Sequence, residues 1–125
     1  MAIAKQVKIG GAYYKGYTID VLSAAGTYST FMALTTGGSA VNSVSIIPDS
    51  AGAGDKINMF HTANSTGGKN VATLAEDIPN LGAKVPINLD LIAMERIDAG
   101  EALKVSYINV ASIAMNVHII VERGR

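Results

Sequence analysis

The last forty residues of the chain alternate apolar and polar side chains in three successive segments. The apolar positions are Val85, Ile87, Leu89 and Leu91, then Leu103, Val105 and Tyr107, then Met115, Val117, Ile119 and Val121. Side chains that recur with a period of two lie on one face of a β-strand, so each segment buries one face. This pattern restricts the chain to an architecture built from consecutive strands.

Similar short segments run through the rest of the chain, between loops rich in Gly, Ser, Thr, Asn and Asp. We expect strands over residues 2–9, 17–22, 28–34, 41–47, 56–62, 85–92, 103–108 and 115–122, whereas 71–77 fits either a strand or a helical turn. No segment carries a helical apolar stripe over three turns. Eight or nine short strands predict an all-β protein, an antiparallel β-sandwich or barrel with little or no helix.

The 125 residues suffice for one domain with its own core and are too few for two. We expect residues 1–16 to form an N-terminal strand or arm, broken at Gly10-Gly11, and residues 17–125 to form a single β-sandwich. The first eight residues lack the continuous apolar stretch of a secretory signal. No run approaches the roughly 20 apolar residues that a membrane helix needs.

The composition combines 49% hydrophobic residues with only 16% charged ones. A small sandwich of this composition leaves apolar surface uncovered, and such surface marks contact sites. Ten basic and ten acidic residues give a formal net charge of zero, so the chain lacks the basic excess that binds nucleic acid. We therefore expect self-association or docking on a larger protein.

The side chains that catalytic sites use are scarce. The absence of cysteine excludes disulfides, thiolate zinc sites and cysteine nucleophiles. His61 and His118 are the only imidazoles, and each lies in a predicted strand outside any recognised motif. The carboxylates considered as a catalytic pair lie mostly near a predicted turn, where acidic residues are common; they are Asp90, Glu95, Asp98 and Glu101. We expect no catalytic site, no metal and no cofactor.

Asp49 and Asp55 flank a loop rich in glycine and alanine. The loop lacks the alternating acidic pattern of an EF-hand. We interpret both aspartates as solvated turn residues and not as calcium ligands.

Three of the five tyrosines fall close together, at Tyr13, Tyr14 and Tyr17. Tyrosine is enriched at the centres of protein interfaces, so the cluster fits a docking patch near the N-terminus. Strand tyrosines that pack on cross-strand neighbours explain the cluster equally well. Stacking of exposed rings on sugars is a third, weaker interpretation.

Residues 97–105, with the sequence Ile-Asp-Ala-Gly-Glu-Ala-Leu-Lys-Val, lead through Ser106-Tyr107 to the strand at 115–122. This arrangement resembles the closing strands of small viral jelly-roll sandwiches. In size, lack of cysteine and density of strands, the whole chain is similar to the capsid decoration (cement) proteins of tailed bacteriophages. The resemblance implies a jelly-roll-like sandwich.

It also implies a structural protein of the virion, made in the host cytoplasm, that binds the outer surface of the capsid as a homo-oligomer and stabilises the shell. The implied partners are the major capsid protein and further copies of the chain, as a dimer or trimer, with no nucleic acid and no membrane.

We expect the partner contacts near the N-terminus, where Lys5 and Lys8 would pair with acidic groups of the capsid. The expected contact residues are Ile3, Lys5, Val7, Lys8, Ile9, Tyr13, Tyr14 and Tyr17. Two other functions stay open. One is a carbohydrate-binding module of a fibre or adhesin, and the other is a small enzyme, which would need His61 or His118 in a pocket beside a carboxylate.

Overall fold

The computed structural model describes residues 5–9, 12–32, 39–64, 69–98 and 100–123. Strands account for most of these residues, and no helix occurs among them. The strands are β1 (Lys5–Ile9), β2 (Ala12–Val21), β3 (Gly26–Met32), β4 (Ser39–Pro48), β5 (Lys56–Thr62), β6 (Asn70–Pro79), β7 (Ile87–Ile97), β8 (Ala102–Asn109) and β9 (Met115–Arg123). The expected all-β class is confirmed.

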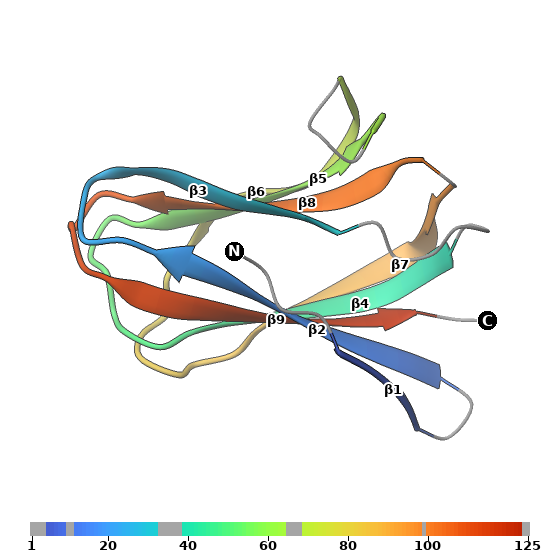
Figure 1. Ribbon diagram of the computed structural model, residues 1–125, viewed down its shortest axis with the longest axis horizontal. Helices are drawn as coiled ribbons and strands as arrows, with labels where there is room; N and C mark the ends of the chain where they lie inside the picture. The colour runs from blue at the N-terminus through green and yellow to red at the C-terminus, as the bar shows by residue number, and fades with distance from the viewer. Residues whose placement is uncertain (1–4, 10–11, 33–38, 65–68, 99, 124–125) are drawn as a thin grey trace.

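The strands form two sheets that stack face to face as a sandwich (Figure 1). Sheet A has the order β1-β2-β9-β4-β7, and sheet B has the order β3-β8-β5-β6. All of the strand pairings in both sheets are antiparallel.

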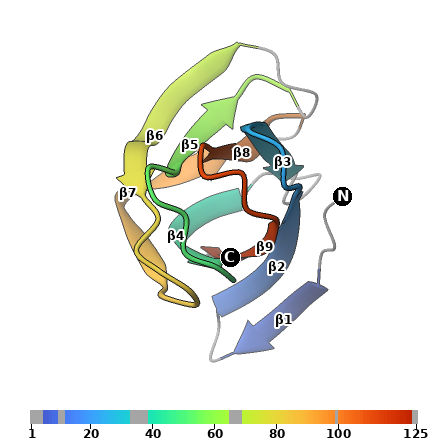
Figure 2. The same cartoon turned by 90° about the vertical axis from the view of Figure 1, so that its left-hand side faces the viewer.

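The pairings are nested. β5 pairs with β6, β4 with β7, β3 with β8 and β2 with β9, so the chain from β2 to β9 doubles back on itself as one long ribbon. Rolling this ribbon brings β9 beside β4 and β8 beside β5, which closes the two sheets (Figure 2). This connectivity is that of a jelly roll, and β1 adds a fifth strand at the edge of sheet A.

The core lies between the sheets and follows the predicted alternation. In β9, Val117, Ile119 and Val121 are fully buried, whereas the neighbouring Ile120 is 41% exposed on the outer face. Tyr107 of β8 is also fully buried. The inward-facing half of each strand therefore supplies the apolar area whose burial drives the fold.

Two segments differ from the expected strands, and residues 71–77, which fitted either a strand or a helical turn, form a strand. β2 begins at Ala12 and not at residue 17, because its pairing with β9 extends as far as Tyr13 and Arg123. The boundary expected between residues 16 and 17 therefore falls inside a continuous strand. Residues 71–77 are part of β6, which pairs with β5. Val85, expected on a buried face, precedes β7 and is 38% exposed.

Four loops gather at one end of the sandwich, on the left in Figure 1. They join β2 to β3, β4 to β5, β6 to β7 and β8 to β9. We call this part of the molecule the loop end and define it as residues 22–25, 49–55, 80–86 and 110–114. It is built by segments that are far apart in the sequence.

Truncation of an inward-facing residue of β9 tests the assigned faces. Ile119→Ala should lower the free energy of unfolding by about 3 kcal/mol, because it leaves a cavity in the core. Ile120→Ala, one position further on the outer face, should change it by less than about 0.5 kcal/mol. Urea unfolding followed by circular dichroism measures both, and equal losses would contradict the assignment.

Candidate functional site

A buried carboxylate holds the loop end together. Asp55 is 1% exposed, and one of its oxygens accepts a hydrogen bond from the Tyr107 hydroxyl at 2.5 Å. Its other oxygen accepts the backbone N–H groups of Val110 at 2.6 Å and Ala111 at 2.9 Å. The expectation that Asp55 is a solvated turn residue is wrong, because these three donors take the place of water.

Asn80 extends this network to a third loop. Its amide nitrogen donates to the Tyr107 hydroxyl at 2.8 Å and to the Ser50 carbonyl at 2.9 Å. Gly52 lies so close to the carboxylate of Asp55 that a Cβ at this position would overlap it. A glycine is therefore needed here for close approach and not for an unusual φ angle.

The protonation states in this network follow from its hydrogen bonds. Burial alone would raise the pKa of Asp55, but the hydrogen bonds from Tyr107, Ala111 and Val110 together lower it below the ordinary value of 3.8. Burial, and then the hydrogen bond to the Asp55 carboxylate, raise the pKa of Tyr107. Asp55 is thus an anion and Tyr107 a neutral donor at neutral pH.

The buried side-chain amide of Asn109 holds the fourth loop, which follows β2. The side chain of Asn109, 1% exposed, donates to the Leu22 carbonyl at 2.9 Å and is directed at the carbonyls of Ala24 and Ile113, both at 3.3 Å. The loop after β2 is thereby joined to the loop after β8. All four loops are held in place by buried polar groups, so the loop end is preorganised.

The same loops carry most of the exposed large apolar side chains. Seven such residues are exposed in the part of the chain that the structure describes, and five of them lie at the loop end: Leu22, Leu81, Val85, Val110 and Ile113. Sequence reasoning missed this surface, since the five residues come from three loops that are far apart in the sequence. The available signal was the presence of leucine, valine and isoleucine in short connections where polar turn residues are usual.

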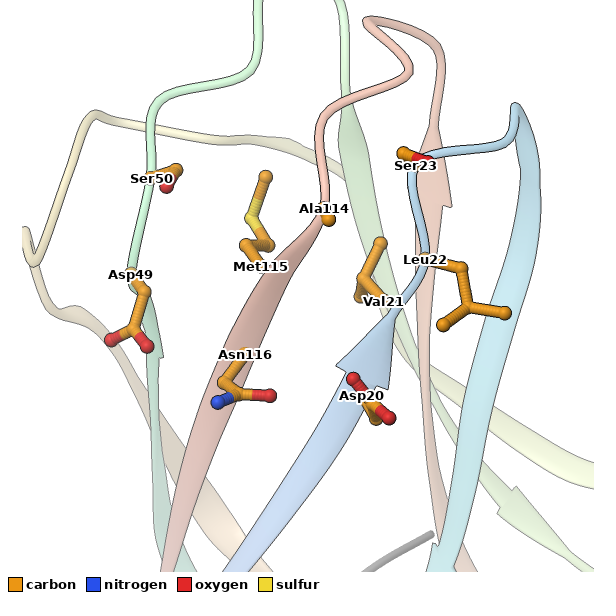
Figure 3. A pocket seen from close by; sticks show the side chains of 9 residues that line it. All are labelled: Asp20, Val21, Leu22, Ser23, Asp49, Ser50, Ala114, Met115 and Asn116. Carbon is orange, nitrogen blue, oxygen red and sulfur yellow. The ribbon is translucent and has the colours of Figure 1, made fainter.

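A broad depression of about 690 Å³ opens beside Leu22 (Figure 3). Figure 3 shows Asp49 and Asp20 on either side of Asn116, and the lining further comprises Val21, Leu22, Ser23, Ser50, Ala114 and Met115. Asp20 and Asn116 are cross-strand partners, and the backbone N–H of Asp49 donates to the Asn116 carbonyl at 2.9 Å. The depression therefore combines a weakly acidic rim with aliphatic walls.

Both histidines lie beside carboxylates. His118 Nε2 is 3.1 Å from Asp49 Oδ1, close to the depression, and His61 Nε2 is 2.8 Å from Glu101 Oε1. The hydroxyls of Ser23 and Ser50 also line the depression, but among the described side chains no hydrogen bond joins either one to an imidazole. The arrangement does not assemble a nucleophile, a base and an orienting group.

His61 and Glu101 form a structural contact instead. Glu101 also accepts the backbone N–H of Asp98 at 2.9 Å, which closes the turn before β8. The hydrogen bond from Asp98 and then the one with His61 lower the pKa of Glu101. Within the described ranges no group of three or more His, Cys, Asp or Glu residues is placed to hold a metal ion.

Two of the expected contact residues, Tyr14 and Tyr17, have described side chains, and both lie on β2 of sheet A. Tyr14, partly exposed on β2, faces the cross-strand partner Glu122. Tyr17 is 6% exposed and belongs to the core, with the Lys15 ammonium 5.6 Å from its ring centre, so it is not accessible to a partner. Ile3 and the side chains of Lys5, Val7, Lys8, Ile9 and Tyr13 lie outside the described part of the chain.

A row of two phenylalanines and a lysine crosses the outer face of sheet B. Lys104 of β8 pairs with Phe31 of β3 on one side and Phe60 of β5 on the other. Its ammonium lies 5.2 Å from the Phe31 ring centre and 5.6 Å from that of Phe60. Cation–π attraction holds this row together.

No protein-family model and no curated protein sequence matches the chain. Solved structures give low-level similarities. The VP2 subviral particle of infectious bursal disease virus is 8% identical with a TM-score of 0.43, over 100% of this chain and 32% of VP2. A family 29 carbohydrate-binding module complexed with cellulohexaose is 12% identical with a TM-score of 0.39, over 97% of this chain and 76% of the module.

An exo-β-1,3-galactanase from Phanerochaete chrysosporium, with galactose, is 15% identical with a TM-score of 0.37, over 96% of this chain and 26% of the galactanase. The solved structures similar to this chain thus include a viral capsid protein and carbohydrate-binding modules, at identities that identify no specific function. The jelly-roll assignment rests on the strand order of the chain itself. Among the described residues there is no helix long and apolar enough to cross a membrane.

Replacement of Gly52 tests the packing of the buried carboxylate. Gly52→Ala should lower the free energy of unfolding by about 2 kcal/mol or more, since the new methyl group displaces Asp55 from its donors. Gly16→Ala is the matched control, because its Cβ meets no atom closer than 4.0 Å. Thermal unfolding of both variants measures the difference, and a Gly52→Ala protein as stable as Gly16→Ala would refute the packing.

Protonation of Asp55 should weaken the fold in acid. Because the folded-state pKa is lowered, the carboxylate contributes stability above its ordinary pKa of 3.8, and this contribution is lost as the pH falls through the folded-state value. Asp55→Asn should be less stable at pH 7 and should lose less further stability between pH 5 and pH 2 than the wild type. Urea unfolding at each pH tests this, and parallel pH profiles would contradict it.

Proposed function

We propose that this protein is a non-enzymatic structural protein that binds the outer surface of a viral capsid as a homo-oligomer and stabilises the shell. The observation that carries the proposal is the loop end, where polar networks hold four loops in place and three of these loops present exposed large aliphatic side chains. Apolar groups on a preorganised surface favour protein contacts, because little ordering entropy is lost on binding. The protein's neutral charge also suits permanent assembly.

The N-terminal hairpin supplies the surface that contacts the capsid. β1 is the edge strand of sheet A, so one side of its backbone has no strand partner in the sheet order. An edge strand can add to a strand of another protein, with backbone hydrogen bonds for affinity and side chains for specificity. We assign the capsid contact to Ile3, Lys5, Val7, Lys8, Ile9, Tyr13 and Tyr14.

Stabilisation of the shell would follow from mass action. A protein that binds the assembled shell and not its dissociated subunits adds the free energy of its own binding to the assembly. At a free concentration one hundred times the dissociation constant, each bound copy contributes about 2.7 kcal/mol.

Co-sedimentation with shells tests the proposal. Shells assembled from the major capsid protein of the same genome should bind the protein saturably and should then dissociate at a higher temperature. Deletion of residues 1–11, which leaves β2 and the buried Tyr17 in place, should abolish binding while circular dichroism still reports a folded sandwich. A genome without a major capsid protein, or shells that do not bind the wild type, would refute the function. Unchanged binding of the truncated protein would refute the N-terminal contact.

The row on sheet B favours a second candidate, a carbohydrate-binding module. Phe31 and Phe60 lie on the outer face of the sheet on either side of one strand, where flat rings can stack on sugars. A glycan array distinguishes the two functions. Binding that is lost in the Phe31→Ala and Phe60→Ala double variant would replace the capsid function, whereas an array without hits agrees with it.

A further inference from the structure

The loop end has the character of a surface for protein self-association. More than half of the Leu22 and Val110 side chains is exposed, at 57% and 58%, on loops that buried Asn109 and Asp55 hold in position. Exposed large aliphatic side chains are normally scattered, and the concentration of five of them on three loops at one end of the sandwich indicates a contact site. The loop end therefore has the properties of a surface that another protein contacts.

The charges of the loop end exclude several kinds of partner. Its accessible charged groups are Asp49, which contacts His118, and Lys84 in the loops themselves. Asp20 near the end of β2 and Lys56 at the start of β5 adjoin them. This balance gives no basic patch for phosphate groups of nucleic acids or anionic lipids. It also lacks the tryptophan and tyrosine side chains that anchor proteins at a membrane interface.

The arrangement of these charges fits a second copy of the chain. Lys84 and Asp49 lie on adjacent loops, since the Lys84 N–H donates to the Pro48 carbonyl at 2.7 Å. In a two-fold symmetric contact, pairing of Lys84 of one copy with Asp49 of the other is automatically repeated in reverse, so one such pair gives two ion pairs. The loop end also carries both a depression, beside Leu22, and an exposed apolar side chain, Val110. Two copies could pack by placing the side chain of one in the depression of the other.

We propose that the loop end is the interface through which copies of this chain associate, with apolar contacts from Leu22 and Val110 and ion pairs between Lys84 and Asp49 of neighbouring copies. The proposal rests on the homo-oligomeric structural function proposed above. It assigns self-association to the loop end and leaves the N-terminal hairpin for the capsid.

The mass of the protein in solution tests the apolar part. Wild-type protein should sediment as an oligomer in analytical ultracentrifugation, and the Leu22→Asp, Val110→Asp double variant should sediment as a folded monomer. Val71→Asp is the matched control, because Val71 is also exposed, at 54%, but lies at the start of β6 away from the loop end. A monomeric wild type, or an oligomeric double variant, would overturn the proposal.

Reversal of the charges of Asp49 and Lys84 tests whether these residues pair between two copies of the chain. Asp49→Lys and Lys84→Asp should each weaken self-association roughly tenfold, because like charges then meet across the interface. The variant that combines both should recover it, since only a homo-oligomer reverses both sides at once. Failure of the combined variant to recover would contradict the pairing of Lys84 with Asp49 across the interface.

Shell binding by the same variants separates this proposal from the proposed function. The monomeric double variant should still bind shells through its N-terminal hairpin, with lower avidity. If the wild type binds shells but the loop-end substitutions leave its mass unchanged, the interface is wrong and the function stands. If the substitutions give monomers but the wild type binds no shells, the interface stands and the capsid function is wrong.

Discussion

The packing of the two inner sheet faces against each other is the constraint on which the rest of this protein depends. Neither sheet can bury its apolar face alone. Because the apolar side chains of each strand must point inward, this packing also fixes the register in which the strands pair. In β9, a shift of one residue would exchange buried Val117 and Ile119 for His118 and Ile120. The nested pairing of β2 with β9 and of β4 with β7 follows from keeping those faces together.

The sequence predicts the strands well where one face is buried and the alternation is strict, as in β8 and β9. The sequence predicts strands poorly where a segment is a strand only because it pairs with a distant part of the chain. The first half of β2 contains glycine and tyrosines with no clear period, and it is a strand because β9 supplies its hydrogen bonds. The burial of Tyr17 was within reach of the sequence, however, since Tyr17, Ile19 and Val21 share one face with a period of two.

The loop-end network was beyond sequence reasoning for a physical reason. An aspartate in a loop rich in glycine is normally solvated, and Asp55 is buried only because its donors come from β8 and the following loop, more than fifty residues away. The residues next to Asp55 in the sequence give no sign of these distant hydrogen-bond donors. The cost of burying the carboxylate is offset by donors that the fold alone assembles, and the resulting network ties together three loops that are far apart in the sequence.

The position of β9 has a consequence for how the chain is made. β9 lies in the middle of sheet A but is the last of the nine strands to leave the ribosome. Until it emerges, β2 and β4 each present an open edge of backbone donors and acceptors, which is the kind of edge that recruits strands from other nascent chains. Pairing of β9 with both of these edges is therefore the step that removes the sites at which a strand of another chain could add.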